Sequence, residues 1–138
     1  MVGQWKASHI SVSREFGGVF VVQVVLNGLR RARLMADTGA AWTSLTRSSL
    51  EKLGVDVARP TGLRQVAVAD SATSISLPVF RLDSIQVGPV KVSDLEVIML
   101  RLPPQLRLDG LLGINFLERF RTTFDFHSQA LVLRRPAA

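Results

Sequence analysis

The chain has 138 residues, enough for one domain with a hydrophobic core, and its 47% apolar and 20% charged residues are typical of globular proteins. It contains no cysteine, which excludes disulfides, zinc–thiolate sites and cysteine nucleophiles. The formal net charge is +6, with 17 Lys and Arg against 11 Asp and Glu. A basic balance of this kind raises nucleic-acid binding as one hypothesis.

The distribution of the basic residues argues against that hypothesis. They are scattered along the chain apart from one group at Arg30, Arg31 and Arg33 and another at Arg134-Arg135. The chain has no tyrosine and only 7% aromatic residues, so no stacking platform alternates with the basic residues. We therefore expect no nucleic-acid partner and interpret the charge as a solubilising surface.

Membrane and metal sites are not expected either. No apolar run approaches the roughly 20 residues that cross a bilayer, and the longest, Val19 to Leu26, is interrupted by Gln23. Residues 1–6 show no signal-peptide pattern. We expect no membrane segment within this chain, so any anchor would lie outside it. His9 and His127 are far apart in the sequence and are predicted at the surface, so we expect no metal and no cofactor.

The first part of the chain predicts a β-hairpin. Residues 1–18 are poorly patterned and predict one edge strand and a turn. Val19–Leu26 is rich in β-branched residues and predicts a buried strand. Asn27-Gly28 is a strong hairpin signal, so Arg30–Met35 is expected to return antiparallel. This hairpin ends at Asp37.

A short strand and a helix follow. Trp42–Leu45 predicts the strand, and Trp42 and Leu45 are expected in the core rather than in a ligand site. Thr46 is a suitable N-cap for a helix over Arg47–Leu53. Gly54 is a suitable residue to end that helix.

The middle of the chain continues the β pattern. Apolar residues alternate at period two on both sides of a small, polar tip, Ala69-Asp70-Ser71-Ala72, which predicts a second hairpin. The alternating residues are Val66, Val68, Ile75, Leu77 and Val79. Further strands are expected at Leu82–Val87, Val90–Val92 and Leu95–Leu100, with a turn at Gly88-Pro89. Arg101–Leu108 contains Pro103-Pro104 and predicts a loop.

The last part of the chain predicts a strand, a short helix and a hairpin. Leu108–Gly113 predicts a buried strand that ends in glycine, and a short helix then runs to Phe120. Thr122–Phe126 and Ala130–Leu133 are expected to pair about a turn at His127-Ser128.

One stretch, Leu34–Ala40, carries the clearest chemical signal. Asp37 is the only acid between Glu15 and Glu51, and apolar residues directly precede it. A charge beside a core costs free energy unless it is paired. From the residues alone, Asp-Thr-Gly is either a simple turn, because Asp and Gly are turn formers, or the site of a working carboxylate.

A second motif supports the working carboxylate. Asp-Thr-Gly-Ala at 37–40, followed by a hairpin and then Leu-Leu-Gly-Ile-Asn-Phe-Leu at 111–117, resembles the retropepsin-like (retroviral-type) aspartic peptidases. The resemblance covers roughly residues 19–133 of a single domain, 1–138, and we expect a bacterial member. It implies a mainly β fold: a closed barrel or sandwich with a flap hairpin and one or two short helices, half of a pepsin-like bilobal unit.

The resemblance also implies the chemistry. As in the aspartic peptidases themselves, two carboxylates that share one proton activate a water and protonate the departing amine. Asp37 would be catalytic, and because the chain has a single Asp-Thr-Gly, a homodimer would bring two Asp37 residues together. Asp109-Gly110 lacks the Thr and is expected to be structural. We expect an aspartic endopeptidase acting on extended polypeptide; the alternative is a non-catalytic peptide-binding or dimerisation module of this fold.

The neighbours of Asp37 gain roles through the same resemblance. Thr38 is expected to hydrogen-bond across the two-fold axis, Gly39 to allow close approach and positive φ, and Ala40 to leave room for substrate. Ala69-Asp70-Ser71-Ala72 is expected to be the flap tip that closes over a peptide held as an added strand. The chain departs from the retroviral members at Ala41, where they carry an acid that binds the substrate backbone, and in a flap tip without glycines.

Overall fold

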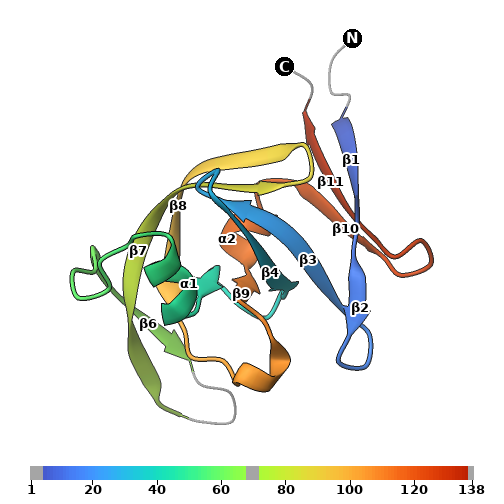
Figure 1. Cartoon of the computed structure of the whole chain (residues 1–138). Helices are drawn as coiled ribbons and strands as arrows, with labels where there is room; N and C mark the ends of the chain where they lie inside the picture. Colours follow the sequence, from blue (N-terminus) through green and yellow to red (C-terminus); the bar gives the residue numbers. More distant parts are fainter. Residues whose placement is uncertain (1–4, 68–71, 137–138) are drawn as a thin grey trace.

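The computed structural model describes residues 5–67 and 72–136, which form a mainly β structure (Figure 1). The strands are β1 (Trp5–Ser11), β2 (Ser13–Glu15), β3 (Val19–Leu26), β4 (Arg30–Ala36), β5 (Ser44–Leu45), β6 (Gly62–Ala67), β7 (Ser74–Val87), β8 (Val90–Met99), β9 (Gly110–Leu112), β10 (Arg121–Asp125) and β11 (Ala130–Pro136). The helices are α1 (Arg47–Lys52), the 3₁₀ turn η1 (Pro104–Leu106) and α2 (Ile114–Leu117).

The larger of the two sheets closes on itself. Its order is β2-β3-β4-β9-β5-β8-β7-β6, and β3 also pairs with β7 through Val25↔Gln86 and Leu26↔Ile85. The strands from β3 round to β7 therefore form a closed barrel, with β2 and β6 outside it. The smaller sheet, in the order β1-β11-β10, lies beside the barrel (Figure 1). The predicted mainly β, closed-barrel fold is confirmed.

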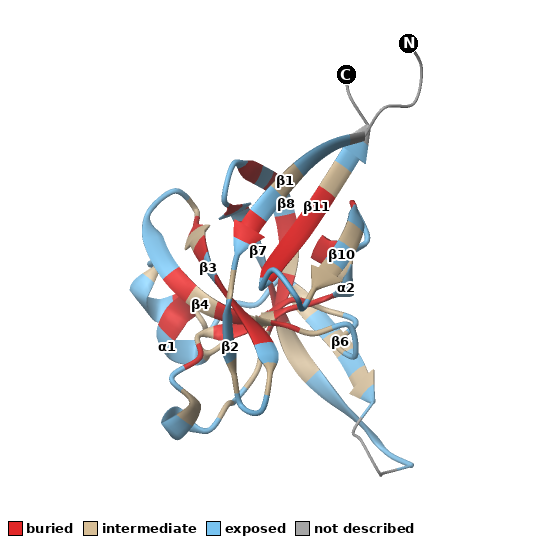
Figure 2. Cartoon of the chain, turned by 90° about the vertical axis from the view of Figure 1, so that its right-hand side faces the viewer, coloured by how far each residue is buried: buried red, intermediate tan, exposed pale blue. Residues whose placement is uncertain are grey.

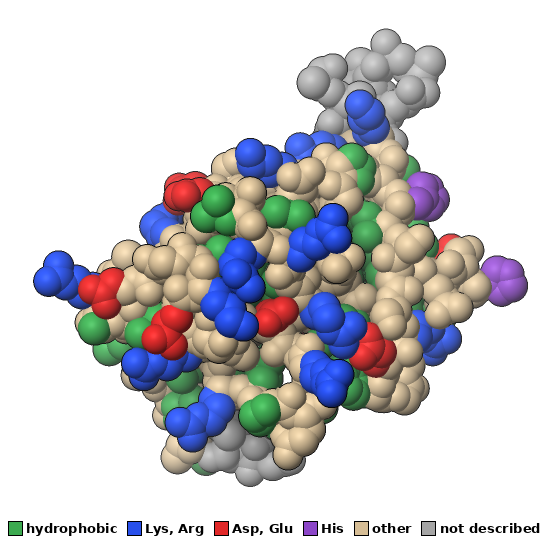
Figure 3. All heavy atoms as spheres, viewed as in Figure 1, with side chains coloured by type: hydrophobic (Ala, Val, Ile, Leu, Met, Phe, Trp, Pro, Cys, Tyr) green, Lys and Arg blue, Asp and Glu red, His purple; other side chains and the backbone are tan. Residues whose placement is uncertain are grey.

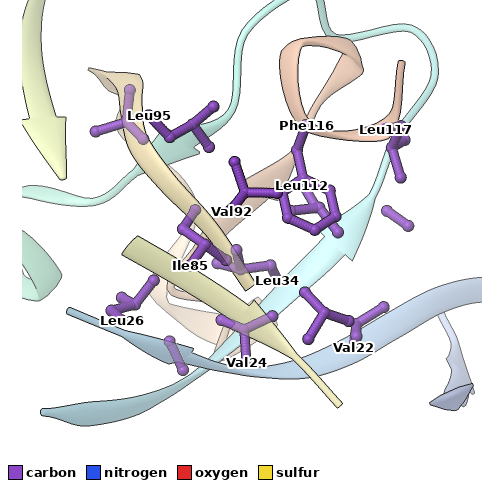
Figure 4. Packing of buried hydrophobic residues seen from close by; sticks show 14 of the residues in the cluster. Val22, Val24, Leu26, Leu34, Ile85, Val92, Leu95, Leu112, Phe116 and Leu117 are labelled. Carbon is purple, nitrogen blue, oxygen red and sulfur yellow. The ribbon is translucent and has the colours of Figure 1, made fainter. Parts of the chain in front are cut away.

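The core fills the barrel. Val22, Leu34, Leu112 and Phe116 are completely buried and approach one another from β3, β4, β9 and α2 (Figure 4). Burying one such side chain is worth about 1.5–3 kcal/mol. Buried segments concentrate in the middle of the molecule, whereas the outer part of the β6–β7 hairpin carries mostly exposed and half-buried residues (Figure 2).

The hairpin of β3 and β4 forms as the sequence predicts. Asn27 and Gly28 adopt φ values of 52° and 65°, the two positive angles of a type I′ turn. The turn is closed by the N–H of Leu29, which donates to the Leu26 carbonyl at 2.9 Å. This turn sets the register in which β4 delivers Asp37 to its loop.

A short strand inserted between two others completes the barrel. β5 pairs parallel with β8 and antiparallel with β9, and β9 in turn lies parallel to β4. Gly110 makes this packing possible, since a Cβ there would lie 1.9 Å from the Ser44 carbonyl oxygen. Any side chain at this position would push β5 away from β9.

Helix α1 has the predicted caps at both ends. The Ser49 N–H donates to the Thr46 hydroxyl at 3.3 Å, and Gly54, with φ of 80°, follows the last turn. The N–H groups of Gly54 and Val55 donate to Glu51 and Leu50, the bond pattern of a Schellman motif. The helix ends at Lys52, one residue before the predicted end.

Two expectations about strands are corrected. Residues 1–18 contain two strands, and β1 pairs with β11 along its whole length, so Trp5 lies opposite Pro136. β7 is one continuous strand instead of two, because it stays paired with β8 from Val79 onwards. Val79 and Phe80 are both buried within it, so the apolar alternation changes phase there while the strand continues.

Candidate active site

Asp37 lies at the carboxyl end of β4, where the chain leaves the barrel wall. Its N–H donates to the Leu112 carbonyl at 3.0 Å, and its carbonyl accepts from the Ala40 N–H at 3.2 Å. Its Oδ1 accepts the N–H of Gly39 at 2.8 Å, which forms a tight Asx turn. No hydrogen bond to Oδ2 is formed within the described part of the chain. The turn therefore orients the carboxylate and engages only one of its oxygens.

Gly39 is required for space rather than for an unusual backbone angle. A Cβ at this position would lie 3.1 Å from Asp37 Oδ1, tight against the carboxylate. Gly39 is not among the described glycines with positive φ, so the positive φ that it was expected to allow is not used here. The glycine of the motif instead lets the backbone approach the carboxylate oxygen.

The second motif holds the loop of Asp37 in place. The N–H groups of Ile114 and Asn115 donate to the carbonyls of Ala40 and Ala41 at 2.8 and 3.2 Å. Gly113 permits this contact, because a Cβ there would lie 2.8 Å from the Ala40 carbonyl oxygen. The start of α2 is therefore hydrogen-bonded directly to the residues that follow Asp-Thr-Gly.

A buried polar pair adds to this anchor. Thr43 is fully buried, and both its N–H and its hydroxyl donate to Asn115 Oδ1, at 2.8 and 2.7 Å. The Asn115 amide donates to the Glu96 carbonyl at 2.7 Å, and Gly113 N–H donates to the Thr43 hydroxyl at 3.1 Å. Sequence reasoning missed both residues, although Asn115 stood in the second motif.

Asp37 borders two cavities. The first, which we name the substrate cavity, has about 320 Å³ and is lined by Asp37, Gly39, Ala40, Ala41, Trp42, Ser44, Gln65, Val66, Ala67, Ile98, Leu100 and Leu111. The second, which we name the aromatic cavity, has about 360 Å³ and is lined by Gly18, Val19, Phe20, Ala36, Asp37, Thr38, Phe124 and Phe126. Both also include residues of the Asp-Thr-Gly loop, so Asp37 separates two mainly apolar hollows.

The β6–β7 hairpin supplies one wall of the substrate cavity through Gln65, Val66 and Ala67. This hairpin extends away from the barrel (Figure 1), and its residues 65–67 line the same cavity as the Asp37 loop. Of the expected tip, Ala69, Asp70 and Ser71 lie outside the described residues, and Ala72 is exposed.

Trp42 is placed differently from the sequence prediction. Leu45 is fully buried as expected, but Trp42 is only half-buried and lines the substrate cavity. The guanidinium of Arg64 lies 5.5 Å from the centre of the indole ring, and Arg64 is held by Glu96 at 2.8 Å. Trp42 is therefore a wall of the candidate site.

Asp109 is engaged in structural bonds. Its Oδ2 accepts the Arg33 N–H at 2.8 Å, and its Oδ1 accepts the Ser49 hydroxyl at 3.2 Å. Arg33 also binds Glu15 through two hydrogen bonds of 2.8 and 3.0 Å. The bond to Glu15 raises the pKa of Arg33, with a smaller contribution from the charge of Asp109, and the same bond lowers the pKa of Glu15.

The remaining polar residues do not gather into a second centre. His9 and His127 are exposed, and within the described residues no three His, Asp or Glu side chains are placed to bind a metal ion. On the face seen in Figure 3, basic side chains are interspersed with acidic ones rather than forming one stripe. No helix in the described ranges is long and apolar enough to span a bilayer.

Comparison with known proteins identifies the family of this chain. A family model described as aspartyl protease matches residues 22–116, from β3 to the start of α2, and the chain belongs to that family. No curated protein gives a significant match to the sequence.

The fold is similar to that of solved retropepsin-like structures. One is a retropepsin-like aspartic protease from Rickettsia conorii, 24% identical, with a TM-score of 0.71 over 98% of both chains. Another is the retroviral protease-like domain of Ddi1 from Leishmania major, 17% identical, with a TM-score of 0.55 over 87% of this chain and 94% of that one. The predicted aspartic peptidase family and its retropepsin-like fold are therefore both confirmed.

Proposed function

We propose that this protein is an aspartic endopeptidase that cleaves extended polypeptide segments as a homodimer, with Asp37 of each chain forming the catalytic pair. The observation that carries the proposal is the position of Asp37 between two cavities, oriented by Gly39 through a single oxygen. Membership of the aspartyl protease family supports it, since the matched range includes this loop.

One chain supplies only half of the chemistry. Hydrolysis needs a base and an acid together, and Asp109 has its oxygens occupied by Arg33 and Ser49. A two-fold axis beside Thr38 brings a second, identical carboxylate to the first. Thr38 is exposed, as its proposed hydrogen bond to the opposing loop requires.

The aromatic cavity supports an interface on that side of Asp37. Phe20 packs against Phe124 and Phe126, with ring centres 5.4 and 5.0 Å apart. Phe126 remains 55% exposed and Val19 36% exposed, so apolar surface lies open next to Thr38. Dimerisation that pairs the two carboxylates would also bury this apolar surface against the second copy of the chain.

In the assembled site, the ionised Asp37 takes a proton from a water molecule, and the water oxygen attacks the carbonyl carbon of the scissile peptide. The protonated Asp37 of the second chain gives its proton to the departing amine as the C–N bond breaks. The substrate lies between the Asp37 loop and the β6–β7 hairpin, whose proposed flap tip, Ala69-Asp70-Ser71-Ala72, closes over it. Trp42 and Val66 face the substrate across the same cavity.

Incubation with a denatured polypeptide at mildly acidic pH tests the proposal. We expect cleavage that a transition-state mimic directed at the aspartate pair suppresses, and specific activity that falls on dilution through the dissociation constant of the dimer. Constant specific activity at concentrations where sedimentation detects only monomer would disprove the shared site.

A non-catalytic peptide-binding or dimerisation module is the competing proposal. It is favoured by Ala41, which leaves the loop without the acid that retroviral members use to bind the substrate backbone. This module would bind extended peptide and form the same dimer without cleaving the polypeptide at any pH. Peptide binding measured beside the cleavage assay separates the two proposals.

A further inference from the structure

A third cavity continues the substrate cavity along the barrel. It has about 400 Å³, and we name it the arginine cavity; it is lined by Thr46, Arg47, Ser48, Leu77, Met99, Leu100, Arg101 and Leu102. Leu100 lines both cavities. The two hollows are therefore neighbours, with one leucine between them.

Two parallel segments lead from the first cavity to the other. β5 and β8 pair in parallel, with Ser44 opposite Ile98, and both of these residues line the substrate cavity. Two positions further on, Thr46 and Leu100 line the arginine cavity. Two residues of extended chain span roughly 7 Å, and side chains two residues apart point to the same side of a strand. An extended peptide following this direction places alternate side chains in the two cavities.

The chemistry of the arginine cavity differs from that of its neighbour. Its floor is apolar, from Leu77, Met99 and Leu102, while Arg47 and Arg101 bring positive charge and no acidic residue lines it. Arg47 has an exposed ion pair with Glu51 at 3.4 Å, a contact weak enough to be exchanged for a ligand. An apolar floor beneath two guanidinium groups suits a side chain with an aliphatic stem and a carboxylate.

We propose that the arginine cavity is a subsite for an acidic side chain of the polypeptide substrate, preferably Glu, two residues from the residue whose side chain fills the substrate cavity. This inference rests on the proposed function in one respect, which is that the ligand is an extended polypeptide. It does not require that the protein cleaves this polypeptide. Arg47 and Arg101 are the specificity-determining residues.

Peptide binding to Asp37→Asn protein, which removes turnover from the assay, tests the subsite. The probes are fluorescein-labelled, amidated alanine-rich peptides with one Leu, and with Glu or Gln either two residues before or two residues after it. Affinities are measured by fluorescence anisotropy. For one of the two positions, before or after the Leu, we expect the Glu peptide to bind about five-fold more tightly than the Gln peptide. The difference should shrink at high salt.

Variants connect that preference to the cavity. Arg47→Ala and Arg101→Ala, each made in the Asp37→Asn protein, should reduce the preference for Glu, and Arg101→Glu should turn it towards a Lys peptide. Arg59→Ala is the matched control, because Arg59 is exposed, pairs with Asp56 and is not part of this cavity. Circular dichroism verifies that each variant is folded.

Equal affinity for Glu and Gln peptides in both orders would overturn the subsite. A preference that survives both Arg47→Ala and Arg101→Ala would overturn it as well, since the acid would then bind elsewhere. Failure of the wild-type protein to cleave any polypeptide would instead remove the endopeptidase proposal and leave the binding result standing.

Discussion

Asp37 and Asp109 stand at opposite ends of the same pair of parallel strands, β4 and β9, and each has a glycine close behind it. Both oxygens of Asp109 accept hydrogen bonds, from the Arg33 N–H and the Ser49 hydroxyl. Within the described residues, the carboxylate of Asp37 accepts a hydrogen bond only from the Gly39 N–H, through Oδ1, and Asp37 borders two cavities.

The glycines differ in the same way. Gly110 is buried where β5 and β9 come into contact, while Gly39 is exposed and meets only the carboxylate of Asp37. One end of the strand pair therefore uses its Asp and Gly for packing, and the other leaves them accessible to a ligand. The carboxylate of Asp37 is thus oriented without being fully bonded, as its proposed catalytic role requires.

The largest expected effect is that of Asp37→Asn on turnover. Asn keeps an oxygen that accepts the Gly39 N–H but cannot act as a base, so peptide cleavage should fall by at least about 100-fold. The free energy of unfolding should change by less than about 0.5 kcal/mol. A peptide assay and urea unfolding measure the two quantities, with Asp109→Asn as the matched control. Undiminished turnover in Asp37→Asn would remove the catalytic role of this residue.

Gly110→Ala should have the largest effect on stability. The added Cβ would lie 1.9 Å from the backbone oxygen of Ser44, which cannot move without separating β5 from β9. We expect a loss of about 3 kcal/mol or more, measured by urea unfolding. Gly39→Ala is the control, with its Cβ 3.1 Å from Asp37 Oδ1, and it should reduce turnover much more than stability. Equal stability losses in the two variants would contradict the comparison.

Asp109→Ala should destabilise the protein by about 1–3 kcal/mol, because the N–H of Arg33 and the hydroxyl of Ser49 lose their acceptor. Turnover per folded molecule should persist, since Asp109 is not part of either cavity next to Asp37. Thermal unfolding together with the peptide assay tests both statements. A folded variant without activity would assign Asp109 to the chemistry and break the contrast with Asp37.

The smallest expected effect concerns Glu15, which extends the structural network through Arg33. The hydrogen bond from Arg33 lowers the pKa of Glu15 below its usual value, so the folded state favours the ionised form. The resulting stabilisation is present above the ordinary Glu pKa of about 4.3 and is lost as pH falls through the lowered pKa. Wild-type protein should therefore lose its small advantage over Glu15→Gln as the pH falls through this range. Melting temperatures of both proteins against pH provide the test, and parallel curves would show that the ion pair contributes nothing.

Much of the fold was predictable from neighbouring residues. The β-branched run of β3, the Asn27-Gly28 turn and the caps of α1 at Thr46 and Gly54 are local signals, and all appear in the structure as expected. The family resemblance rested on two short motifs, and the match over residues 22–116 confirms it. The catalytic role of Asp37 and the dimer stay predictions.

Other features depended on residues far apart in the sequence. Trp42 looks like a core residue by its type, but it lies in the loop before β5, and Arg64 of β6 lies over its ring at the edge of a cavity. The bonds between Thr43 and Asn115 join residues 72 positions apart, so no local pattern indicates them.

The sequence by itself determined most of the strands, the Asn27-Gly28 turn and the single Asp-Thr-Gly, because φ/ψ preferences, side-chain alternation and capping act between neighbouring residues. Only the tertiary structure decided which aspartate has both carboxylate oxygens hydrogen-bonded and which one borders two cavities. That outcome depends on the insertion of β5 between β9 and β8, and on the contacts of Ser49 and Arg33 with Asp109. These are packing and hydrogen-bonding constraints between distant segments, and they exist only once the barrel has closed.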